Sequence, residues 1–80
     1  MEKKVIYLGS FDKAVEFVYR VSNYAAALKL SSGSSRVNAA SLLGVLSLNL
    51  SDPLVLEIYG EEASRKNLLS TIQPFLIEEW

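Results

Sequence analysis

The chain has 80 residues and a formal net charge of −1, and half of its residues are hydrophobic, which is enough for one domain with a small core. It contains neither cysteine nor histidine, so disulfides and thiolate metal sites are excluded, and we expect neither a metal nor a cofactor. No basic cluster favours nucleic acid, and no apolar run resembles a signal peptide or a membrane span, which favours a cytoplasmic protein without nucleic-acid or membrane partners.

The beginning of the chain predicts a strand followed by a helix. The β-branched and aromatic run of residues 5–8 is typical of a strand and is closed by Gly9. Ser10 can cap the next helix by accepting a hydrogen bond from a free backbone N–H, and the helix should end near Asn23. The helical period predicts that its buried stripe comprises Phe11, Ala14, Val15, Val18 and Ser22.

The next segment has the pattern of a β-hairpin. Between residues 25 and 30, apolar side chains alternate in the way that is typical of a half-buried strand. The serine-rich and glycine-containing residues 31–34 predict a turn, so residues 35–38 should return as the partner strand.

The second half of the chain predicts a short helix, a strand and a final helix. Ser41 stands before an apolar run and can cap a helical turn. Residues 54–58 alternate as a strand, and Glu61 and Glu62 then open the last helix, where negative charge is stabilised. Pro74 should end that helix near Gln73. The residues expected to pack from this helix and from the tail onto the body are Leu68, Leu69, Ile72, Phe75, Leu76 and Trp80.

These elements give the order β-α-β-β-α-β-α within a single domain of residues 1–80. Because strands and helices do not alternate strictly, the fold class is α+β, with a four-stranded, mainly antiparallel sheet and three helices on one of its faces. Such an arrangement is an open-faced β-sandwich. Lys3 and Lys4 are expected at a solvated edge of the first strand, where lysine discourages pairing with other chains.

Residues 36–48 read Arg-Val-Asn-Ala-Ala-Ser-Leu-Leu-Gly-Val-Leu-Ser-Leu. This stretch resembles the central segment of HPr, the phosphocarrier protein of the bacterial sugar phosphotransferase system. The similarity extends from about residue 14 to residue 77. It implies the same open-faced sandwich and a cytoplasmic, bacterial protein.

The loop that carries the phosphorylated histidine in the HPr family is altered in this chain. Aligning the loop through Ala14 brings Ser10 to the histidine position and Asp12 to the position of an arginine that neutralises phosphate. A carboxylate would repel phosphate instead. We therefore expect no catalytic residue, no enzyme activity and no ordinary phosphotransfer. Ser10 is then either a helix cap or, as a less favoured alternative, an unusual phosphoacceptor.

The resemblance also implies a regulatory site. Ser41 matches a serine that an ATP-dependent kinase phosphorylates in some family members, although a serine at this place can equally be a simple helix cap. Leu42, Leu43 and Leu46 match an apolar turn that binds the family's partners. Core packing alone is the alternative, but a short helix cannot bury all of these side chains, so at least one should be exposed.

The face of the sheet without helices offers a second candidate surface. By alternation it should be largely apolar, with few charges besides Lys29 and Glu57. An uncovered apolar face usually marks an interface, so the protein could pair with itself or with another chain here. The residues of this possible oligomer face are Ala25, Ala27, Val55 and Tyr59.

Three functions follow from these observations. The first is a non-catalytic, HPr-like regulatory or protein-interaction domain, with serine phosphorylation as an optional regulatory mark, whose expected partners are phosphotransferase-system or catabolite-regulation proteins. The second is a phosphocarrier with an unusual acceptor. The third is an unrelated binding module that shares only the fold.

Overall fold

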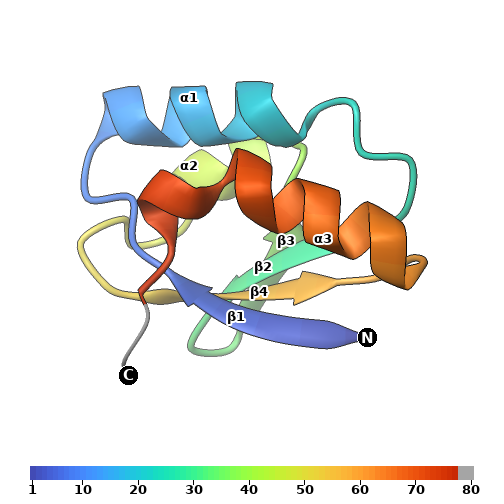
Figure 1. Ribbon diagram of the computed structural model, residues 1–80. Coiled ribbons are helices and arrows are strands. Elements are labelled where there is room, and N and C mark those ends of the chain that lie inside the picture. The colour runs from blue at the N-terminus through green and yellow to red at the C-terminus, as the bar shows by residue number, and fades with distance from the viewer. Residues whose placement is uncertain (78–80) are drawn as a thin grey trace.

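The computed structural model describes residues 1–77 as two layers, a four-stranded sheet and three helices that cover one of its faces (Figure 1). The predicted order and the open-faced arrangement are confirmed. The elements are β1 (Glu2–Ile6), α1 (Phe11–Val21), β2 (Leu28–Ser32), β3 (Ser35–Asn38), α2 (Leu42–Leu46), β4 (Leu54–Ile58), α3 (Glu62–Thr71) and the 3₁₀ turn η1 (Gln73–Phe75).

The strands lie in the order β1-β4-β2-β3, and every neighbouring pair is antiparallel. The central strand β4 therefore joins β1 to the β2–β3 hairpin. Leu54, Leu56 and Ile58 of β4 are fully buried and face the helices, while the alternate residues of this strand face the other way. The core consequently lies between the sheet and the helical layer.

The first strand begins earlier than predicted. β1 starts at Glu2 because Lys3 and Lys4 pair with residues of β4, opposite Glu57 and Leu56. It ends at Ile6, since the N–H of Tyr7 donates instead to the carbonyl of Phe75, 2.9 Å away. β1 is an edge strand, as the two lysines predicted.

The predicted buried stripe of α1 is wrong for several of its members. The residues of α1 that are buried are Ala14, Phe17 and Val21, whereas Phe11 is 60% exposed and Val15 is 37% exposed. α1 carries apolar residues on two sides, and only one side can face the sheet. Phe17 decides which side it is, because its ring packs edge-on against that of Phe75, with centroids 5.6 Å apart. Val18, also in the predicted stripe, is partly buried, and Ser22 is an exposed C-terminal cap.

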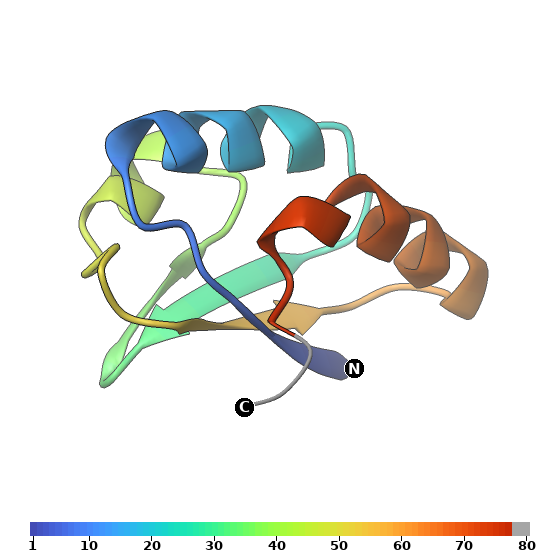
Figure 2. The same ribbon diagram turned by 60° about the vertical axis from the view of Figure 1, so that its left-hand side comes forward.

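The C-terminal segment returns to β1, as Figure 2 shows. α3 ends at Thr71, and Pro74 lies in the 3₁₀ turn that follows, in agreement with the predicted helix end. Phe75 is buried and Leu76 pairs with Ile6 of β1, so the predicted packing of the tail is confirmed for these two residues. The predicted packing of Trp80 concerns a residue outside the described part of the chain.

Candidate functional site

Ser10 lies immediately before α1 and acts as its cap. Its Oγ accepts a hydrogen bond from the N–H of Lys13 at 3.2 Å, and its carbonyl accepts one from Ala14 at 3.1 Å. Gly9 precedes it with a φ of +80°, and a side chain there would meet the ring of Tyr7 at 2.7 Å. Ser10 is therefore held in position by its neighbours, with its hydroxyl oxygen already used by the helix.

The charges around Ser10 do not form a phosphate site. Asp12 occupies the first turn of α1, where its carboxylate opposes any second anion. The nearby cation, Lys13, lies 4.0 Å from the carboxylate of Glu16, so its charge is partly neutralised. A nucleophilic serine also needs an adjacent base, and the chain has no histidine to supply one.

Ser41 caps α2 in the same way. Its Oγ accepts a hydrogen bond from the N–H of Gly44 at 3.3 Å, and its carbonyl accepts one from Val45 at 2.9 Å. Gly44 permits this close fit, because a side chain there would lie 3.2 Å from Cβ of Val37 and 3.4 Å from the Ser41 Oγ. Ser41 is half-buried, so its hydroxyl still lies near the surface.

The leucine-rich helix α2 presents part of its apolar surface to solvent. Val45 is fully buried and anchors the helix in the core, whereas Leu42 and Leu46 are half-buried. Leu43 is 83% exposed, which confirms the prediction that at least one of these leucines would be exposed. No acidic residue lies in the first turn of α2 and no basic residue in its last turn.

The exposed side of α1 is apolar as well. Phe11, Val15 and Tyr19 are spaced four residues apart and so share one side of the helix. Tyr19 is 80% exposed, which is unusual for an aromatic side chain of this size. α1 and α2 are packed against each other. We call the exposed residues Phe11, Val15, Tyr19 and Leu43 the helical apolar face.

Sequence reasoning missed three of these four residues. It assigned Phe11 and Val15 to the buried stripe and did not consider Tyr19. The signal that could have identified them was the second apolar stripe on α1, through Phe17 and Val21, which together with Ala14 is large enough to fill the core by itself.

The outer sheet face, which no helix covers, is held by a polar network. Arg36 of β3 donates two hydrogen bonds to the carboxylate of Glu57 in β4, at 2.9 and 3.2 Å, and the hydroxyl of Tyr59 donates a third at 2.8 Å. These hydrogen bonds, above all those from Arg36, lower the pKa of Glu57 to about 2. The hydrogen bonds to Glu57 and the attraction of its negative charge raise the pKa of Arg36.

This network corrects the expectation of a largely apolar outer face. Besides the expected Lys29 and Glu57, Lys3 and Arg36 lie on it, because the register places Lys3 opposite Glu57 and Arg36 opposite Ser31. Sequence reasoning could not place them, since the cross-strand register is not visible in the sequence.

Of the residues of the predicted oligomer face, Val55 and Tyr59 lie on the outer sheet face, whereas Ala25 does not. Val55 is exposed there, and Tyr59 is half-buried and donates a hydrogen bond to Glu57. Ala27 precedes β2, and its carbonyl accepts a hydrogen bond from the N–H of Tyr59. Ala25 lies instead beside α3, in a pocket at the C-terminal end of α1. Self-association through these residues stays a prediction.

Ser41, Leu42, Leu43 and Leu46 are brought together in one turn, whereas Ser10 caps a different helix. Within residues 1–77, no group of three or more acidic, histidine or cysteine side chains could hold a metal ion. None of the helices in this part of the chain has the length and apolarity that crossing a membrane requires.

Comparison with known proteins supports the fold alone. No family model matches the chain, and no curated protein matches its sequence. Among solved structures, it is similar to HPr-C-His from Thermoanaerobacter tengcongensis, with a TM-score of 0.73 and 24% sequence identity over 91% of this chain and 92% of the other. The chain therefore has an HPr-like fold, as the resemblance of residues 36–48 implied.

Proposed function

We propose that this HPr-like chain is a non-catalytic domain that binds a protein partner through the helical apolar face. The partner would be a component of the phosphotransferase system or a regulator of catabolite use, in the cytoplasm of a bacterium. This choice of partner and place rests on the resemblance to HPr. The fold supports a relation to phosphocarriers but does not by itself identify the partner.

The observation that carries the proposal is the exposure of apolar side chains on the two packed helices α1 and α2. Of the large hydrophobic residues that are exposed in residues 1–77, four belong to these helices, and Leu43 and Tyr19 are at least 80% exposed. Such side chains cost free energy in water unless a partner covers them. Aromatic residues in particular are common at the centres of protein interfaces.

We infer that phosphorylation of Ser41 could regulate this binding. A phosphate on Ser41 would place negative charge directly beside Leu42 and within one turn of Leu43. It would oppose apolar contact with a partner through the cost of desolvating the charge. Alternatively, a partner with arginine at this place would bind the phosphorylated form more tightly.

The alternative function, a phosphocarrier that uses Ser10, has less support. Its hydroxyl oxygen caps α1, Asp12 adds a negative charge beside it, and the neighbouring Lys13 is near Glu16. Two incubations followed by intact-mass spectrometry separate these functions. One contains phosphoenolpyruvate and the general phosphotransferase enzyme, and the other contains ATP and an HPr kinase.

The regulatory proposal expects a gain of one phosphate with ATP only, which is lost in Ser41→Ala and kept in Ser10→Ala. A phosphate gained from phosphoenolpyruvate and lost in Ser10→Ala would instead establish the carrier function. No phosphate in either incubation would leave binding through the helical apolar face as the function and remove its regulation at Ser41.

Binding itself is tested with the immobilised protein and purified general phosphotransferase enzyme or catabolite regulator. We expect one of them to bind, and Leu43→Asp to abolish binding without lowering the stability of the protein, because the side chain of Leu43 is almost fully exposed. Equal binding by Leu43→Asp would contradict the proposed surface. The absence of binding to both proteins would favour the unrelated binding module.

A further inference from the structure

The outer sheet face carries more positive than negative charge. The charged side chains that the four strands direct to this face are Lys3, Lys29, Arg36 and Glu57. Three of these four are cations, although the chain as a whole has a net charge of −1. A local excess of positive charge attracts acidic ligands and raises the rate at which they bind.

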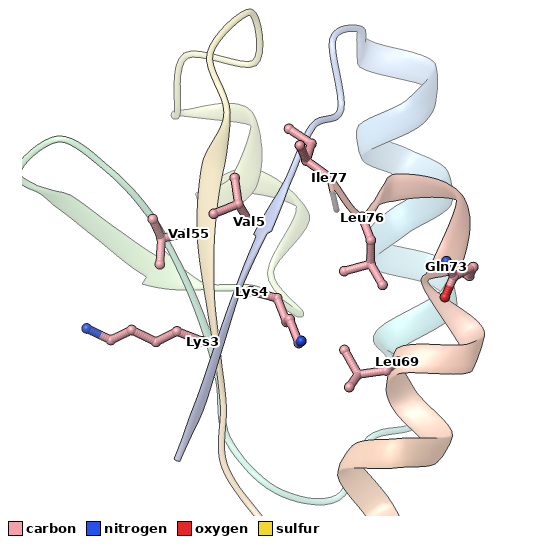
Figure 3. Close-up of a pocket in the computed structure, with 8 residues that line it drawn as sticks. All are labelled: Lys3, Lys4, Val5, Val55, Leu69, Gln73, Leu76 and Ile77. Atoms are coloured by element: carbon pink, nitrogen blue, oxygen red, sulfur yellow. The ribbon is translucent and has the colours of Figure 1, made fainter. Parts of the chain in front are cut away.

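Lys3 and Lys29 lie on either side of Glu57 in one row across the strands. The register places Glu57 of β4 opposite Lys3 of β1 and opposite Lys29 of β2. Figure 3 shows that Lys3 points to the side of Val55, which is the outer side, whereas Lys4 points toward α3. Because neighbouring strands are ~4.8 Å apart, the Cα atoms of the two outer lysines are ~10 Å apart. One segment that crosses the strands can therefore contact both lysines.

The carboxylate of Glu57 does not neutralise these lysines, because other groups already use it. Arg36 donates two hydrogen bonds to it, at 2.9 and 3.2 Å, and the hydroxyl of Tyr59 donates a third at 2.8 Å. Only 12% of the Glu57 side chain is exposed, so its charge is largely shielded from solvent. In the described part of the chain, Lys3 and Lys29 are the only lysine or arginine side chains without a carboxylate at ion-pair distance.

Apolar area lies beside the two lysines. Val55 is 36% exposed and stands two residues before Glu57 in β4, so both side chains are on the same side of the sheet. Val5 of β1 lies opposite Val55 and is half-buried. An acidic segment that also carries apolar side chains would cover these valines while its carboxylates meet the lysines, and burial of the apolar area would add to its affinity.

We propose that the outer sheet face binds an acidic segment of a second protein, whose carboxylates pair with Lys3 and Lys29. A protein fits this surface better than a nucleic acid, because two free cations neutralise few phosphates and the remainder of the chain has an excess of negative charge. The sheet separates this surface from the helical apolar face, so the two surfaces bind their partners independently (Figure 1).

A short acidic peptide tests the charge requirement directly. The probe is Glu-Glu-Val-Glu-Glu and the control is Gln-Gln-Val-Gln-Gln, both acetylated and amidated so that their termini carry no charge. NMR spectra of the isotope-labelled protein follow each backbone amide during the titration. We expect the acidic peptide to shift amides of β1, β2 and β4, the neutral peptide to shift none of them, and the dissociation constant to rise with salt concentration.

The double variant Lys3→Gln/Lys29→Gln removes both charges without placing a carboxylate beside Glu57. It should raise the dissociation constant of the acidic peptide at least roughly threefold, because two exposed ion pairs are lost. Lys13→Gln/Lys66→Gln is the matched control, since it removes two charges from exposed lysines of α1 and α3 and should leave the dissociation constant unchanged.

Three results would overturn the proposal. The first is that no amide of the sheet shifts with the acidic peptide, or that the two double variants bind it equally. The second is tighter binding of single-stranded oligothymidine at the same amides, which would make a nucleic acid the occupant. The third is a shift of these amides when the protein alone is concentrated, which would make a second copy the occupant.

Leu43→Asp keeps this test separate from the proposed function. It changes the helical apolar face, on the other side of the sheet, and should bind the acidic peptide as the natural protein does. Failure of the helical apolar face as a binding surface would therefore leave the result at the outer sheet face unaffected.

Discussion

The outer sheet face and the helical side of this small protein differ in the kind of groups that they expose. On the outer sheet face, Arg36, Glu57 and Tyr59 form hydrogen bonds with one another, so this polar cluster needs no group from a partner. On the helical side, Tyr19 and Leu43 have large apolar side chains that are at least 80% exposed. The same fold thus carries a polar cluster whose groups are paired with one another and an apolar surface whose side chains are uncovered.

The comparison shows that a sheet face without a covering layer need not be apolar. From the sequence, the uncovered side of the sheet is the obvious candidate for pairing. The structure places the ion pair of Arg36 and Glu57 across the strands on that side, and it leaves exposed apolar area on the side where the helices already cover the sheet. Which groups remain without partners is therefore more informative than which layer is missing.

The largest expected effect separates the two sides of α1. Phe17→Ala should lower the free energy of unfolding by ~3–5 kcal/mol, because Phe17 is fully buried and packs on Phe75. Phe11→Ala, on the exposed side, should change it by less than ~0.5 kcal/mol. Urea unfolding followed by circular dichroism measures both. Similar losses in the two variants would mean that the helical apolar face is part of the core.

The next prediction compares two valines of nearly equal exposure. Val15 on α1 is 37% exposed and Val55 on the outer sheet face is 36% exposed. With an identified partner, Val15→Lys should weaken binding by ~1–2 kcal/mol, whereas Val55→Lys should leave the dissociation constant unchanged. Isothermal titration calorimetry measures the dissociation constants of both variants. A greater loss of binding in Val55→Lys would show that the interface lies on the outer sheet face instead.

A smaller effect concerns the two serine caps. Ser41→Ala and Ser10→Ala should each lower stability by ~1 kcal/mol, since each removes an acceptor for a free N–H at a helix start. The helix α2 has only five residues, so its local protection should fall more than that of α1. Amide hydrogen exchange of the two helices reports this difference. Unchanged amide exchange of α2 in Ser41→Ala would show that the burial of Val45, rather than the cap, stabilises this helix.

The smallest effect is a pH dependence confined to the outer sheet face. The pKa of Glu57 is lowered from 4.5 to about 2 in the folded protein, so the stability that it contributes is present above about pH 4.5 and is lost as the pH falls toward 2. Glu57→Gln should therefore be less stable than the natural protein at pH 7, with the difference shrinking toward pH 2. Unfolding midpoints at several pH values test it, and a constant difference would contradict the role of Arg36.

Much of the fold could be predicted because local rules and packing agree. Ser10 and Ser41 cap their helices as expected, and the alternation of residues 54–58 correctly identified the central strand. The HPr-like sandwich was visible both in the order of elements and in residues 36–48. At these places, no tertiary contact competes with the local preference.

The remaining errors have one cause, which is that tertiary contacts choose between equivalent local patterns. Either side of α1 could face the sheet, and the contact between Phe17 and Phe75, 58 residues apart in the chain, decides the matter. Likewise, the partnership of Arg36 with Glu57 depends on β3 lying two strands from β4, across β2. Such choices determine the candidate site more than the fold, because they decide which side chains remain exposed.

The place of β4 between β1 and β2 also constrains how the chain is made. Glu2 pairs with Ile58, so more than two thirds of these 80 residues must be synthesised before the partner of the first strand leaves the ribosome. The β2–β3 hairpin can form early, but it lacks its other neighbour until the same moment. The sheet should therefore assemble in one late step when residues 54–58 appear, at a rate limited by closing the long loop back to β1. A nascent chain stalled before β4 would expose to other chains the edges of β1 and β2 that pair with β4 in the folded protein.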